Sequence, residues 1–188
     1  MNNSLFYGLV LASLNYNCTD VNSQESASVK TMQDSVYVGS GPTHFSDDLV
    51  RDDALYTTLI RVDQRQNNEY VLSVQMNLKK DAYFVSPNAK RDFSGKFTIV
   101  LANPEKIVTK GAINEAPSSE EELDKGEGLV NWVRKNTHYT QTLKVLSNEN
   151  FEVKGHIQFT IEPRCTLEKI PFILSYENGK LRLNMDGC

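Results

Sequence analysis

The sequence has no apolar run that approaches the ~20 residues needed to cross a bilayer as a helix. Its three histidines, His44, His138 and His156, are scattered, and none stands at a metal-ligand spacing from another histidine or a cysteine. It has neither a glycine-rich phosphate loop nor a serine elbow. The net charge of −4 argues against wide contact with nucleic acid, which needs clustered Lys and Arg. We therefore expect no cofactor, no metal and no nucleic-acid partner.

An uncharged apolar run occupies residues 5–14, within the ~7–15 residues of a signal-peptide core. Cys18 follows, and residues 1–18 together resemble a bacterial lipoprotein signal, in which the cysteine becomes the lipidated first residue of the mature chain. The match departs at residues 15–17, where the pattern prefers a leucine and a small residue, and no Lys or Arg precedes the run. We expect export to the periplasm or outer membrane with lipid on Cys18. The alternative is a short buried strand or helix.

A polar tether is expected over residues 19–50, which have little periodic apolar content and contain the sequence Gly39-Ser40-Gly41-Pro42. Such a spacer would let an anchored domain stand off the membrane.

Residues 51–188 change to a period-two pattern of apolar and polar side chains, which is typical of half-buried strands. The clearest strand is 152–161, with Val153, Ile157, Phe159 and Ile161 on its buried face. No helix of ordinary length is indicated, and the acidic run 118–124 is expected to be a helical turn or a loop. The pattern predicts an all-β, antiparallel, immunoglobulin-like sandwich. The other expected strands are 56–63, 70–78, 95–101, 129–135 and 138–147.

The last strand pair is predicted by Asn178-Gly179, the preferred centre of a two-residue hairpin turn. The turn sets three apolar pairs on one face and, extended further, places Lys169 opposite Cys188. The three pairs are Tyr176 with Leu181, Leu174 with Leu183, and Phe172 with Met185.

Residues of about 56–183 resemble the N-terminal domain of DsbD, the periplasmic immunoglobulin-like module of a transmembrane thiol:disulfide reductase. The resemblance lies in the order of a few segments rather than in single positions. These are the strand 68–74, the aromatic segment 82–87, the strand 153–159, Cys165, and the segment 170–172.

The resemblance implies a cysteine pair that takes electrons from a membrane domain and passes them to soluble partners. Cys165 stands at the first position of that pair, but Lys169 stands at the second, and the family's tryptophan is absent from the aromatic segment. If residues 163–168 curl as they do in the family, Cys188 can reach Cys165 and form a disulfide. Such a bridge could be a structural staple, which we favour, or a redox pair in which Arg164 and Lys169 supply the activating charge.

Three functions follow from these observations. The first is a non-catalytic binding or accessory module with a protein partner in the envelope. The second is a thiol:disulfide exchange partner that uses Cys165 and Cys188. The third is a sugar- or peptide-binding lipoprotein that uses loop 103–128. Trp132 could stack on such a ligand, although a core or half-buried position is more usual for a tryptophan in a sandwich.

The anchor is tested on the mature protein. We expect a chain that lacks residues 1–17 and carries lipid on Cys18, as measured by intact-mass analysis of envelope-purified protein. An unmodified chain that begins at Met1 would rule the anchor out.

Overall fold

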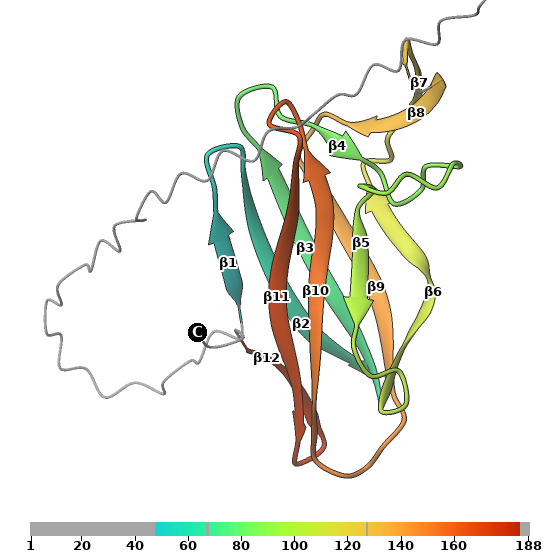
Figure 1. The fold of residues 1–188 in the computed structure, drawn as a ribbon. Coiled ribbons are helices and arrows are strands. Elements are labelled where there is room, and N and C mark those ends of the chain that lie inside the picture. The colour runs from blue at the N-terminus through green and yellow to red at the C-terminus, as the bar shows by residue number, and fades with distance from the viewer. Residues whose placement is uncertain (1–47, 67, 127, 185–188) are drawn as a thin grey trace, which may run out of the picture. The chain divides into compact units, whose positions relative to one another are not determined.

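Two antiparallel sheets face each other in the part of the chain that the computed structural model describes, residues 48–66, 68–126 and 128–184 (Figure 1). One sheet has the order β1-β2-β3-β9-β6 and the other has the order β12-β11-β10-β5. A smaller sheet, β4-β8-β7, stands at one end of the sandwich (Figure 1). The strands are Leu49–Asp52 (β1), Tyr56–Gln66 (β2), Glu69–Leu78 (β3), Phe84–Val85 (β4), Thr98–Leu101 (β5), Ile107–Ala116 (β6), Glu121–Asp124 (β7), Gly128–Val133 (β8), Thr137–Val145 (β9), Phe151–Ile161 (β10), Thr166–Glu177 (β11) and Lys180–Asn184 (β12).

The described residues form no helix, and so none that could cross a membrane. The prediction of an all-β antiparallel fold is confirmed for this part of the chain. The signal and anchor residues 1–18, including Cys18, lie outside the described residues, as does most of the expected tether.

The core between the two large sheets is filled by aromatic side chains. Phe97 and Tyr139 stack with their ring centroids 4.1 Å apart, and Phe159 lies 5.2 Å from both Phe84 and Tyr56. All five side chains are fully buried. Such rings bury large apolar areas and gain further from their mutual geometry, so this cluster is a main source of stability.

The predicted alternation along β10 is confirmed. Its four large apolar residues, from Val153 to Ile161, are buried, whereas Lys154 is exposed and His156 is half-buried. Gly155 also lies on the buried side of β10. A Cβ at this position would come within 2.5 Å of the ring of Phe172, its partner in β11. The glycine thus makes room for the aromatic ring across the strand pair.

The hairpin between β11 and β12 also forms as predicted. Asn178 and Gly179 have φ values of 50° and 77°, the left-handed values that this turn requires. Tyr176 pairs with Leu181 and Leu174 pairs with Leu183, and these four side chains are buried. The expected pairs that involve Met185 and Cys188 fall outside the described residues.

Several expected boundaries differ from the structure. The acidic run is not a helical turn, because β7 spans Glu121–Asp124 and pairs with β8. The expected loop 103–128 contains both β6 and β7. Leu49 is a buried residue of β1, so the sandwich includes the last residues assigned to the tether. Strand β5 begins at Thr98, three residues later than expected.

Strand β10 supplies a test of the core. Phe159→Ala should lower the free energy of unfolding by about 3–5 kcal/mol, because it empties a fully buried aromatic site. His156→Ala, on the opposite face of the same strand, should cost less than about 0.5 kcal/mol. Urea unfolding of both variants measures the difference, and equal effects would contradict the register.

Candidate functional site

Cys165 is an exposed residue at the tip of the β10–β11 hairpin, with a φ of 53°. Strand β11 begins at the next residue, Thr166, which pairs with Ile161, the last residue of β10. The expected curl through residue 168 is therefore wrong, because β11 pairs directly with β10 from its first residue onward. Cys188 lies outside the described residues, so its disulfide with Cys165 stays a prediction.

Arg164, the residue before Cys165 in the chain, is held by neighbouring carboxylates. Arg164 donates to the carboxylate of Glu168 at 2.6 Å and lies 3.3 Å from that of Asp53. The hydroxyl of Tyr56 also donates to Glu168, at 3.0 Å, and burial together with the charge of Glu168 raises the pKa of Tyr56. The Arg164 cation is thus shared between two carboxylates.

Lys169 is also separated from Cys165. Residues 166–169 are extended, and four extended residues span ~13 Å at ~3.3 Å per residue. Lys169 instead lines a shallow hollow with Lys154 and His156 on the outer face of β10 and β11. Of the two cations expected to activate a redox cysteine, Arg164 is therefore already paired with carboxylates and Lys169 is distant from Cys165.

The Trp132 face, which we define as Tyr83, Trp132, Arg134 and the segment 117–120, lies at the same end of the sandwich. Tyr83 meets the edge of the Trp132 indole at a centroid distance of 5.0 Å and an angle of 90°. The Arg134 guanidinium lies 4.2 Å from the ring centroid of Tyr83 and 5.8 Å from that of Trp132. Both rings are half-buried, and Arg134 also bonds to Glu122 at 3.3 Å. Trp132 is therefore neither a core residue nor a fully exposed one.

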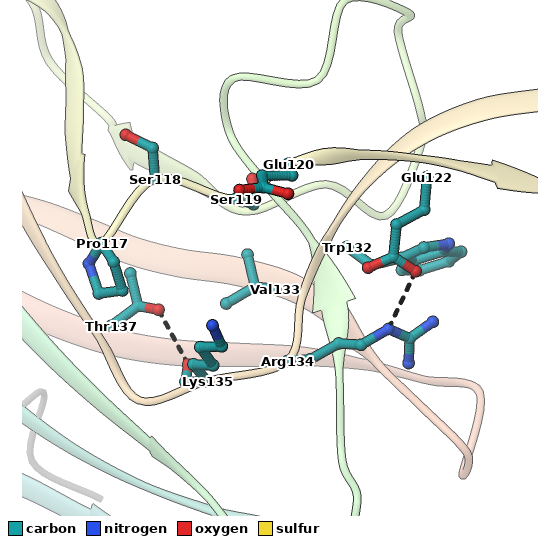
Figure 2. Close-up of a pocket in the computed structure, with 10 residues that line it drawn as sticks. All are labelled: Pro117, Ser118, Ser119, Glu120, Glu122, Trp132, Val133, Arg134, Lys135 and Thr137. Carbon is teal, nitrogen blue, oxygen red and sulfur yellow. Dashed lines mark hydrogen bonds and ion pairs between the residues drawn. The ribbon is translucent and has the colours of Figure 1, made fainter.

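Two hollows meet at Trp132. One has a volume of about 200 Å³ and lies between the segment 117–120 and the end of β8, where Arg134 and Lys135 form the opposite rim (Figure 2). The other has a volume of about 430 Å³ and reaches Cys165. Its lining includes Arg91, Phe93 and Glu162 as well as the indole. The indole thus contributes to both concave surfaces.

Glu115 holds the elements behind this face together. Its side chain is buried in β6, and Oε2 accepts hydrogen bonds from the Ser86 hydroxyl at 2.8 Å, the Asn88 amide at 3.3 Å, and both the backbone N–H and the hydroxyl of Ser119 at 3.3 and 3.1 Å. Oε1 accepts from the Tyr139 hydroxyl at 3.2 Å. Burial, then the charge of Glu115, raises the pKa of Tyr139. One carboxylate thereby links the segment 86–88 and Ser119 to Tyr139 of β9.

Sequence reasoning missed Glu115 because nothing around it in the sequence marks it. Its hydrogen-bond partners Ser86 and Tyr139 lie 29 and 24 residues away along the chain. The described residues contain no group of three or more side chains able to hold a metal ion.

No family model and no curated protein matches the chain. Among solved structures, it is similar to the DsbD N-terminal domain of Neisseria meningitidis in its reduced form, with 7% identity, 70% of this chain and 91% of that chain covered, and a TM-score of 0.42. The structure of the complex between the DsbD and PilB N-terminal domains of the same organism matches with 10% identity, coverages of 65% and 84%, and a TM-score of 0.39. The GAE domain of GGA2p from Saccharomyces cerevisiae matches with 10% identity, coverages of 70% and 98%, and a TM-score of 0.37. The suspected likeness to the DsbD N-terminal domain is thus found, and the proposals below rest on the chain's own residues.

The Glu115 network predicts a large effect of one substitution. Glu115→Ala should lower the free energy of unfolding by about 3 kcal/mol or more, because several buried donors lose their acceptor and each costs about 1–3 kcal/mol. Glu115→Gln should cost less, since the amide oxygen still accepts and the hydroxyl groups can turn to accept from its NH₂. Glu120→Ala, an exposed glutamate nearby, is the matched control. Urea unfolding measures all three, and an alanine variant as stable as the control would show that the network stabilises nothing.

Proposed function

We propose that the chain is a non-catalytic binding module of the cell envelope that holds a protein partner against the Trp132 face. The observation that carries the proposal is the contiguous cluster of Tyr83, Trp132 and Arg134, each of which keeps part of its surface exposed. Tryptophan, tyrosine and arginine are the residues enriched at the energetic centres of protein interfaces. Their packing also limits the freedom that they would lose on binding.

The size of the smaller hollow favours a side chain of a protein over a small molecule as its occupant. The hollow of about 200 Å³ is below the ~300–1,000 Å³ usual for a small-molecule site, so it suits one side chain of a larger partner. The second hollow, of about 430 Å³, lies within that range, but it shares the Trp132 indole with the first. A partner surface that covers Trp132 can place one group in each, whereas a sugar or cofactor would fill only one.

The location in this proposal rests on the N-terminal sequence. The apolar run 5–14 and Cys18 support export followed by lipid attachment, and residues 19–48 would then separate the sandwich from the membrane. The partner would accordingly be another envelope protein, and the membrane contact would be made by the lipid alone.

Thiol:disulfide exchange is the second candidate, because Cys165 is exposed and lines the same hollow as Trp132. It needs a disulfide between Cys165 and Cys188, which non-reducing peptide mapping would detect. The sharing of Arg164 between two carboxylates favours a staple over a reactive bridge.

One experiment separates the two candidates. A photo-reactive amino acid at position 120, beside the hollow of Figure 2, would cross-link a bound partner to the full-length protein in the cell envelope. We expect Trp132→Ala and Arg134→Ala to reduce the cross-linked product at least about tenfold, because truncating a central interface residue costs ~2 kcal/mol or more. Cys165→Ser, which keeps the size of that side chain in the hollow, should leave the yield unchanged, and so should Lys180→Ala at the start of β12.

The opposite pattern identifies the rival function. Loss of the product in Cys165→Ser, with normal yield from the Trp132 and Arg134 variants, would overturn the binding proposal in favour of thiol exchange. Urea unfolding of each variant shows whether a lost product reflects a lost fold, and Arg134→Ala, at a surface position, provides a variant that should stay folded.

A further inference from the structure

Strand β7 offers an open edge beside the Trp132 face. In the described part of the chain β7 pairs with β8 alone, so its other edge has no strand beside it. Figure 1 shows β7 and β8 standing at one end of the domain, apart from the two large sheets. An exposed strand edge carries backbone N–H and C=O groups that an extended peptide can pair with.

The two faces of the β7–β8 ribbon differ in chemistry. Leu123 pairs with Leu129 on one face, and their exposed fractions are 80% and 55%, so the ribbon presents an apolar cross-strand pair to solvent. On the other face Glu122 pairs with the buried Val130, and Asp124 pairs with Gly128. By strand alternation, this second face continues toward Trp132, and Glu122 and Trp132 line the same hollow (Figure 2).

We propose that an extended segment of the protein partner adds to the free edge of β7, and that this segment alternates apolar and basic residues. The inference deepens the proposed function and rests on it. Apolar side chains of the added strand lie beside Leu123 and widen the apolar face that Leu129 continues on β8, while its Lys or Arg side chains lie on the opposite face beside Glu122 and Asp124. The period of two follows from strand geometry, the apolar residue follows from Leu123, and the basic residues follow from Glu122 and Asp124 on the other face.

Charge favours this occupant. Four of the five residues at positions 120–124 are acidic. Glu121 and Glu122 already bond to Lys90 and Arg134, but these are solvent-exposed pairs, which contribute little and can be exchanged for the partner's cations.

A second copy of the chain fits the edge poorly. Antiparallel pairing of β7 with the same strand of another molecule would set the acidic segment 120–124 against itself. Like charges directly opposite each other destabilise a strand pair. An acidic partner segment would be disfavoured for the same reason.

Three fluorescently labelled nine-residue peptides test the proposal by anisotropy with the full-length protein. One alternates lysine with valine, one alternates glutamate with valine, and one has the composition of the first with its lysines grouped at one end. We expect the alternating basic peptide to bind at least tenfold more tightly than either of the others, and to weaken as salt is raised. Leu123→Ser should reduce its binding at least tenfold. Leu146→Ser, a matched change of an exposed leucine after β9, should have no effect.

The outcomes separate this inference from the proposed function. Equal binding of the three peptides would overturn the docking edge, and so would a Leu123→Ser variant that keeps both peptide binding and partner cross-linking. In either case, the proposed function still stands if cross-linking depends on Trp132. A dimer in sedimentation that is lost in Leu123→Ser also overturns the docking edge, because a second copy would then occupy the edge. Protection of the β7 amide protons from exchange by the alternating basic peptide, and not by the grouped one, supports it.

Discussion

The hydrogen bond from the Tyr139 hydroxyl to Glu115 is the contact on which the candidate site depends. Tyr139 belongs to the aromatic core through its stacking on Phe97, while Glu115 holds Ser86 and also Ser119, which belongs to the Trp132 face. A buried carboxylate is costly unless it is fully hydrogen-bonded, so the loops that supply its donors are constrained to stay where they are. The network thereby ties these segments to the aromatic core between the large sheets.

This constraint explains how the loop segment of the Trp132 face is held in place. The segment 117–120 forms one rim of the hollow beside Trp132, and its position is set by the bonds from Ser119 to Glu115. Residues held in place before binding lose less entropy when a partner arrives. The same end of the sandwich carries Cys165, and the neighbouring Arg164 is bound by two carboxylates.

The parts of the fold that could be predicted from the sequence are those specified by local pattern. Strand β10 has an unbroken alternation. Asn178-Gly179 fixes the β11–β12 hairpin by its backbone conformation alone. Strand β6 was missed because its pairing with β9 is interrupted between Lys110 and Asn114, which breaks the period-two pattern. Strand β7 was missed because glutamate is depleted in strands. Only its pairing with β8 makes the acidic segment a strand.

The candidate site was harder to predict than the fold, because its groups come together only through tertiary structure. Glu115 and Trp132 are single residues without a motif, and the partners of Glu115 lie in distant segments. Cys165 is the residue that the sequence did single out, and the curl considered around it was carried over from the resembling family. The direct pairing of β11 with β10 leaves only a short turn, in which Cys165 is the last residue before β11.

Trp132 is the only tryptophan of the chain, so its fluorescence reports on the proposed binding face alone. The most direct measurement is acrylamide quenching of that fluorescence in the full-length protein, with and without the partner recovered by cross-linking. Any tryptophans of the partner are first replaced, so that only Trp132 is observed. A half-buried indole that a partner covers should be quenched several times less efficiently in the complex. Quenching that stays the same when binding is complete would contradict the account, because the partner would then lie elsewhere on the domain.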